Sequence, residues 1–98
     1  MNRSFEIRAP AQKDIATAWS WYAQRGRGLG ERFLRALEEC FSRIQHGPES
    51  HARVHPRVRR ALLRHFPYGV FYCVEEHRIS VIGCLHVRRQ PSLWRSRA

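Results

Sequence analysis

The chain has 98 residues, which is enough for one hydrophobic core and excludes a large multidomain enzyme. Hydrophobic residues make up 43% of it, so we expect an ordinary globular fold in a single domain, residues 1–98. The formal net charge is +10, from 18 basic and 8 acidic side chains. A charge of this size predicts a polyanion or an acidic protein as partner.

The positive charge is concentrated in the second half of the chain. Residues 1–49 carry eight basic and six acidic side chains, whereas residues 50–98 carry ten Arg and two Glu, a net charge of +8. Arg outnumbers Lys by 17 to 1. Guanidinium groups bind phosphate and carboxylate oxygens through two parallel contacts. A GC-rich genome would also explain the preference for Arg, although it would leave the asymmetry unexplained. We therefore predict that the binding surface lies in the second half.

The sequence favours a cytoplasmic protein without metal or cofactor. It has no apolar run of 18 residues, and its first residues lack the apolar core of a signal peptide, so we expect no membrane association. Two histidines, His51 and His55, fall in a predicted loop, and no His or Cys spacing matches a zinc template. The cysteines lie in apolar stretches and are predicted to be reduced core thiols: Cys40, Cys73 and Cys84.

The first half of the chain predicts a strand and two helices. Alternating apolar and charged residues at 5–8 indicate a short strand, and Pro10 then begins a helix that lasts to about Gln24. A glycine-rich turn separates it from a second helix, which ends before Gly47-Pro48. We expect the two helices to form an antiparallel hairpin. Their predicted buried stripes are Ile15, Ala18, Trp19 and Tyr22 in the first helix, and Phe33, Leu34, Leu37, Cys40, Phe41 and Ile44 in the second.

The second half predicts a sheet. After a polar loop to about Pro56, the apolar period changes from 3.6 to 2, and residues 58–66, 68–75 and 79–86 indicate three consecutive antiparallel strands. The order β-α-α-β-β-β predicts an α+β domain in which the hairpin packs on a four-stranded sheet, with the first strand at an edge. The last two strands are apolar on both faces. We therefore expect the basic C-terminal tail, residues 87–98, or a partner to cover the second face.

Basic residues in the first of these strands form one candidate surface. Strand alternation predicts Arg60 and Arg64 on one face and Arg59 and His65 on the other. Guanidinium groups about 7 Å apart along a strand could contact successive phosphates of a nucleic acid. The alternative is a solvated strand face.

The tail is the other candidate surface. It combines several Arg with Trp94 and contains no acidic residue, a mixture suited to base stacking or to anchoring in a protein pocket. The alternative is a frayed terminus in which Trp94 only packs back on the sheet.

The sequence contains no arrangement typical of nucleophilic catalysis and no phosphate-binding loop. If the protein is an enzyme, phosphodiester cleavage is the chemistry that its Arg and His residues could support. His65 or His86 would act as base, and Arg64 or Arg88 would stabilise the charge of the transition state. We therefore treat an endoribonuclease as the alternative to a binding protein.

Short motifs along nearly the whole chain occur in an order and spacing that resemble the ParE/RelE superfamily of toxins from bacterial type II toxin–antitoxin modules. The motifs are Ala11-x-x-Asp14-Ile15, Trp21-Tyr22, Gly28-Leu29-Gly30-x-x-Phe33, Pro48, Arg59-Arg60, Phe66-Pro67-Tyr68-x-Val70-x-Tyr72 and His86-x-x-Arg89-x-Pro91-x-x-Trp94. The resemblance implies a growth-inhibiting toxin linked to plasmid or chromosomal stability. It also implies a cognate antitoxin, which wraps and neutralises the toxin in a hetero-oligomer.

Two branches of the superfamily imply different functions. RelE-like mRNA interferases, which act on the ribosome, use basic residues on the second strand, an Arg early in the third strand, an Arg after the last strand and usually a Tyr in the tail. In this chain the third-strand position is Gly69 and the tail position is Trp94. Glycine carries no cation and indole has no ionisable hydroxyl, so two of the catalytic groups that an interferase uses are missing. The remaining interferase positions correspond to Arg60, Arg64 and Arg88, with His86 as the possible base.

The Phe66-Pro67-Tyr68 motif and the tail motif are more similar to the ParE branch, whose members inhibit DNA gyrase by binding and are not nucleases. The resemblance therefore implies a gyrase inhibitor with no catalytic residues. A RelE-like endoribonuclease remains the first alternative, and a non-toxic member that only binds its antitoxin is the second. The residues expected to contact the target or the antitoxin are Arg59, Arg60, Arg64, Arg88, Arg89, Trp94 and Arg95.

Overall fold

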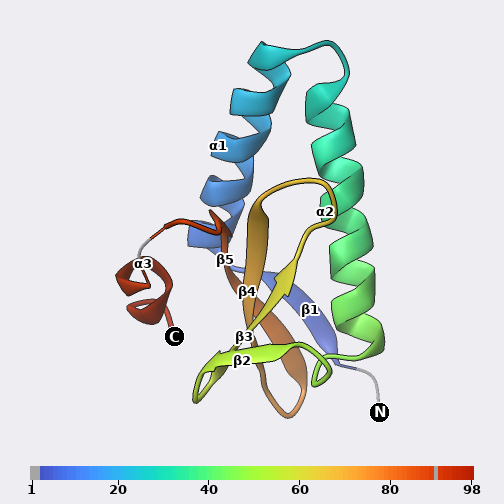
Figure 1. Ribbon diagram of the computed structural model, residues 1–98. Helices are drawn as coiled ribbons and strands as arrows, with labels where there is room; N and C mark the ends of the chain where they lie inside the picture. Colours follow the sequence, from blue (N-terminus) through green and yellow to red (C-terminus); the bar gives the residue numbers. More distant parts are fainter. Residues whose placement is uncertain (1–2, 90) are drawn as a thin grey trace.

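The computed structural model describes residues 3–89 and 91–98, and it has the predicted α+β architecture (Figure 1). A helical hairpin covers one face of a single sheet, and a short C-terminal helix lies beside the sheet (Figure 1). The elements are β1 (Ser4–Ile7), α1 (Ala9–Arg25), α2 (Leu29–His46), β2 (Ala52–His55), β3 (Val58–Leu62), β4 (Tyr68–Val74), β5 (Arg78–His86) and α3 (Ser92–Arg95). None of the described helices is long and apolar enough to cross a membrane.

The sheet has five strands in the order β1-β5-β4-β3-β2, one more than predicted. Strand β1 lies at one edge and pairs in parallel with β5, while the other neighbours are antiparallel. The prediction of a loop around His55 was wrong, because residues 52–55 form the second edge strand. This strand has only four residues and contains a register shift between Arg53 and His55. A short, irregular edge strand has little apolar periodicity, so its sequence resembles a loop.

Strand β3 ends at Leu62, four residues earlier than predicted. The chain leaves the sheet after Leu63, and His65 adopts a positive φ of 68°. A turn of this kind interrupts the alternation of side chains. The backbone N–H of Leu63 donates to the carbonyl of Tyr68, which closes the hairpin between β3 and β4 at 3.0 Å.

The helical hairpin is less buried than the apolar pattern predicted. Trp19 is 42% exposed and Leu34 is 37% exposed, so the expectation that they belong to the core was wrong. Trp19 lies where the two helices cross, and its indole Nε1 comes within 2.9 Å of the position that a Cβ on Gly30 would occupy. Gly30 therefore allows the helices to approach with the Trp19 ring at the rim of their contact. The sheet covers only the opposite side of the hairpin.

The main core lies between the hairpin and the sheet. Among its fully buried side chains are Phe33, Ile44, Val70, Tyr72 and Val81. Tyr72 donates its hydroxyl to the carbonyl of Pro48 at 2.6 Å, which ties β4 to the loop after α2. Burial raises the pKa of the Tyr72 phenol to about 12, so it stays a hydrogen-bond donor at neutral pH.

A second, smaller cluster covers the face of the sheet that points away from the helices, which we call the outer face. It contains Val58, Phe71, Ile82, Leu85 and Trp94. Trp94 belongs to the C-terminal tail, so the tail covers part of this face as one of the two expected alternatives. The three cysteines are free thiols, as predicted; Cys40 and Cys84 are buried and Cys73 is half-buried.

Replacing Tyr72 by Phe removes the hydroxyl and leaves the Pro48 carbonyl without its donor. We expect Y72F to lower the free energy of unfolding by about 1–2 kcal/mol. Urea denaturation would measure the change. Tyr68→Phe is the matched control, because the Tyr68 hydroxyl makes no hydrogen bond within the described part of the chain, and an equal loss in both variants would contradict a role for the Pro48 contact.

Candidate functional site

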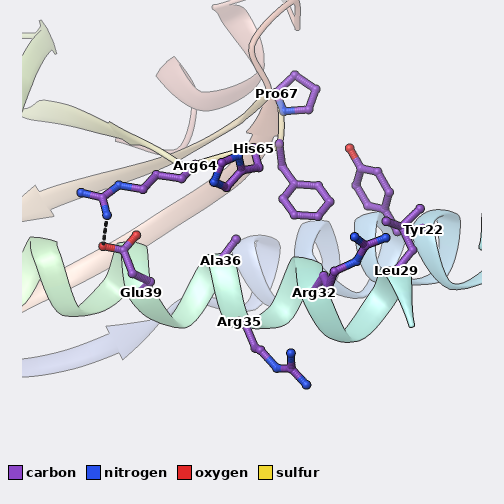
Figure 2. A pocket seen from close by; sticks show the side chains of 10 residues that line it. Tyr22, Leu29, Arg32, Arg35, Ala36, Glu39, Arg64, His65 and Pro67 are labelled. Carbon is purple, nitrogen blue, oxygen red and sulfur yellow. Dashed lines mark ion pairs between the residues drawn. The ribbon is translucent and has the colours of Figure 1, made fainter. Parts of the chain in front are cut away.

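An apolar groove of about 690 Å³ lies between the helical hairpin and the turn that follows β3 (Figure 2). Tyr22 of α1, Leu29 and Ala36 of α2, and Phe66 and Pro67 of the turn form its apolar walls. Phe66 reaches this position because the chain leaves the sheet after Leu63 and turns at His65. Its ring packs edge-on against Tyr22, with ring centroids 4.9 Å apart.

Basic side chains surround the groove. Arg32, Arg35 and Arg64 line it together with a single acidic residue, Glu39 (Figure 2). Arg35 points away from the groove in this view, whereas Arg64 extends along its rim toward Glu39. The Nη1 atom of Arg64 lies 3.6 Å from Oε2 of Glu39, and the Arg64 side chain is 66% exposed. The groove therefore combines an apolar interior with a positively charged rim.

Glu39 is held mainly by its own helix. Arg43, one turn further along α2, donates from Nε to Oε2 of Glu39 at 2.8 Å and from Nη2 to the carbonyl of Leu62 at 2.8 Å. The hydrogen bond from Arg43 is the largest cause of a lowered pKa of the Glu39 carboxyl, and the charge of Arg64 adds to it. Arg43 thus links Glu39 of the groove to the end of β3.

The structure separates the basic residues that were predicted to share a strand face. Arg60 lies on the outer face, where its Cγ and Cδ would be 3.1 Å from a Cβ on Gly69. Arg64 lies on the helix side, beside the groove. The prediction that Arg60 and Arg64 share a face was wrong, because β3 ends before Arg64 and the turn reverses its direction.

Gly69 has a local structural role. Because it has no side chain, the aliphatic stem of Arg60 can lie flat across β4 beside Phe71, its partner in the register. The Nε of Arg60 is buried and has no hydrogen-bond partner within the described residues.

Arg59 holds a loop in place. Its Nη1 donates to the carbonyls of Glu49 and His51, at 3.0 and 2.8 Å, so this guanidinium already binds the loop that leads into β2.

The C-terminal basic residues follow β5 directly. His86 is the last residue of that strand, and its Nδ1 accepts a hydrogen bond from the backbone N–H of Arg88 at 3.1 Å. Arg88, Arg89 and Arg95 are exposed. Trp94, which was also predicted to contact a partner, is only 5% exposed and stacks on Phe71. The tail therefore presents Arg side chains while its indole is buried; residue 90 of the tail lies outside the described residues.

The residues proposed for the alternative catalytic reading do not form one cluster. Arg60 lies on the outer face and Arg64 on the helix side, while His86 and Arg88 are adjacent at the end of β5.

Burial raises the pKa of the Cys40 thiol to about 11 and that of Cys84 to about 12, so both remain protonated at neutral pH. Within residues 3–89 and 91–98, no three His, Cys, Asp or Glu side chains gather as metal ligands.

The sequence analysis missed the apolar groove, because its walls come from three separate segments. Leu29 and Ala36 belong to α2, and Tyr22 was predicted only as a core residue. The sequence did contain one signal, the Phe66-Pro67 pair. A large apolar residue beside a turn-forming proline lies near the surface, and it forms an apolar patch there unless another segment covers it.

These features describe a small basic α+β domain with an apolar groove, a positively charged rim and a basic tail packed on the sheet. Residues 5–91 match the family model described as the ParE toxin of type II toxin–antitoxin systems, parDE. The chain therefore belongs to the ParE toxin family, which confirms the resemblance.

A solved structure described as the chromosomal ParDE toxin–antitoxin system from P. aeruginosa shares the fold, with a TM-score of 0.74. The match is 17% identical and covers 86% of this chain and 95% of that chain. A comparison with curated proteins found no match.

The lowered pKa of Glu39 makes its contribution to stability dependent on pH. Its folded-state pKa lies below the unfolded value of about 4.3, so the stabilisation is complete above that value and is lost as the pH falls through the folded-state pKa. We expect Glu39→Gln to be less stable than the wild type at pH 7. At pH values below the folded-state pKa of Glu39, the two proteins should be equally stable. Urea denaturation at a series of pH values would test this.

Glu38→Gln is the matched control for this titration. Glu38 lies on the same helix and is exposed, and it makes no ion pair within the described part of the chain. A pH-independent difference between Glu39→Gln and wild type would contradict the role assigned to the carboxylate.

Proposed function

We propose that this ParE-family protein is a toxin that acts in the cytoplasm by binding DNA gyrase and that a cognate antitoxin neutralises it. Gly69 and Trp94 are the residues that favour gyrase binding over RNA cleavage as the activity. Gly69 supplies no cation, and Arg60 fills the space beside it; Trp94 supplies no ionisable hydroxyl and is buried against Phe71. Inhibition by binding requires neither group.

The separation of the basic residues supports the same choice. Cleavage of a phosphodiester requires a base, a cation and an acid around one phosphate. Arg60 and Arg64 lie on opposite sides of the sheet, so they could not both contact the same phosphate without a rearrangement of β3 and the turn after it. A surface that binds a protein has no such requirement.

Purified toxin should inhibit the supercoiling of relaxed plasmid DNA by gyrase. We expect inhibition to weaken by about ten-fold when Arg88 and Arg89 are both replaced by Glu, because the substitutions reverse two charges on the proposed contact surface. Arg25→Glu/Arg27→Glu, at the end of α1 and on the exposed turn that follows it, reverses the same number of charges and should inhibit as the wild type does. Normal supercoiling at a large excess of wild-type toxin would exclude gyrase as the target.

Mapping the 5′ ends of mRNA in cells that express the toxin would test the alternative. A gyrase inhibitor leaves translated mRNA intact, whereas a ribosome-dependent interferase produces cuts within codons, and these would disappear in Arg88→Ala. Growth that is unaffected by expression would instead favour a non-toxic member that only binds its antitoxin.

The antitoxin should carry an acidic or amphipathic segment that complements the basic half of the chain. The partner can be identified as the product of the neighbouring open reading frame and purified with the toxin. We expect its affinity to fall by about ten-fold between low and physiological salt, since screening weakens contacts between exposed charges. The substitutions Arg89→Ala and Arg95→Ala should each reduce this salt dependence. An affinity that is unchanged by salt and by both substitutions would contradict an electrostatic contact.

A further inference from the structure

The C-terminal tail ends in a helix that cannot be stable alone. Helix α3 has four residues, Ser92–Arg95, whereas isolated helices need about 12–15 residues to form even marginally in water. Contacts with the rest of the protein must therefore hold it. Figure 1 shows α3 and the C-terminus beside the N-terminal end of α1 and the strand β5.

The first anchor is Trp94. Its ring stacks on Phe71 of β4, with centroids 5.0 Å apart and an interplanar angle of 18°, and His55 of β2 contacts it edge-on at 6.2 Å. This contact buries the indole ring and holds the helix near the outer face.

The second anchor is Arg97, which is directional. Its Nη1 donates to Oδ2 of Asp14 at 2.6 Å and to the carbonyl of Ile82 at 3.1 Å, and its Nη2 lies 3.4 Å from Oδ1 of Asp14. The Arg97 and Asp14 side chains are 23% and 13% exposed. A guanidinium in a two-point contact with a partly buried carboxylate restricts both distance and orientation.

The two side chains meet at an open edge of the sheet. Strand β1 pairs with β5 only as far as Val81, whose carbonyl accepts from the N–H of Arg8 at 2.9 Å. Beyond this point no described strand pairs with that side of β5. Asp14 accepts from the N–H of Cys84 at 3.1 Å, and Arg97 donates to Ile82, so the ion pair satisfies backbone groups that β1 leaves free.

The lack of a side chain at Gly83 lets the guanidinium of Arg97 lie close to the strand. A Cβ at this position would lie 3.1 Å from Nη1 of Arg97 and 3.5 Å from Oδ2 of Asp14. The guanidinium therefore lies against the backbone of β5 because residue 83 has no side chain. Residues 14, 83 and 97 come from α1, β5 and the tail, and a side chain at residue 83 would crowd the guanidinium of Arg97.

We propose that Asp14, Gly83 and Arg97 are the positioning residues that fix the C-terminal tail against the open edge of β5. This gives the exposed Arg88, Arg89 and Arg95 a defined place on the surface rather than a flexible one. The consequence for target binding rests on the function proposed above, whereas the fixing of the tail does not.

Amide hydrogen exchange measured by NMR tests the positioning directly. In Arg97→Gln, amides of residues 94–98 should exchange at least about ten-fold faster, because charge-assisted hydrogen bonds are lost, while amides of β4 should stay protected. Arg88→Gln is the matched control. It removes the same charge from the same tail, but Arg88 is exposed and its side chain makes no ion pair within the described residues. Unchanged tail exchange in Arg97→Gln, or an equal increase in Arg88→Gln, would overturn the proposal.

Asp14→Asn provides a second, isosteric variant should Arg97→Gln fail to fold. It keeps an acceptor for Cys84 but loses the charge, so it should loosen the tail to a similar degree. The double variant Asp14→Asn/Arg97→Gln should add little to either single change, because both remove the same interaction. Full additivity in exchange rates would show that the two residues act independently.

The functional consequence is measured with gyrase. Arg97→Gln should require a higher concentration than wild type for equal inhibition of supercoiling, whereas Ile44→Val, a core variant on the opposite side of the sheet, should not, even at an equal loss of melting temperature. Equal potency of Arg97→Gln and wild type would contradict the role of tail position in target binding. If wild-type toxin does not inhibit gyrase, the proposed function fails and the exchange result still decides the positioning.

Discussion

The structure depends on the burial of both faces of β4 and β5. These central strands are apolar on each side, so one face needs the helical hairpin and the other needs a second cover. No second layer of helices lies on that face within the described residues, and Trp94 of the tail covers part of it. The position of the tail is therefore part of the fold and not a terminal addition to it.

This constraint also divides the basic residues into different roles. Arg59 binds backbone carbonyls of the loop before β2, and Arg97 binds Asp14 and the edge of β5, so both stabilise the fold. Arg64 lies at the rim of the groove, and Arg88, Arg89 and Arg95 are exposed on or near the tail. Of these residues, the second group is the one whose side chains are exposed to an acidic partner. A high net charge therefore overstates the charge that is available for binding.

The helical hairpin and the central strands were predictable because their periodicity is long and regular. The α1 and α2 stripes extend over several turns, and β4 and β5 are rich in β-branched and aromatic residues. Strand β2 and helix α3 have four residues each, too few for any periodic signal, and both depend on contacts with distant segments. The end of β3 was misjudged for a related reason: apolar Leu63 and Phe66 continue the strand-like composition, although the chain leaves the sheet after Leu63.

The amino-acid sequence alone determined the α+β class, the order of the main elements, the asymmetry of charge and the motifs of the ParE family, because each is a local or additive property. Tertiary structure decided which Arg side chains bind other groups of the protein and are therefore not available to a partner. It also decided that Arg60 and Arg64 lie on opposite sides of the sheet and that a groove forms around Phe66. It also brought Asp14, Gly83 and Arg97 together at one edge of β5. Contacts between residues this far apart depend on the register and ends of the strands, and a one-residue change in either would place the same side chains elsewhere.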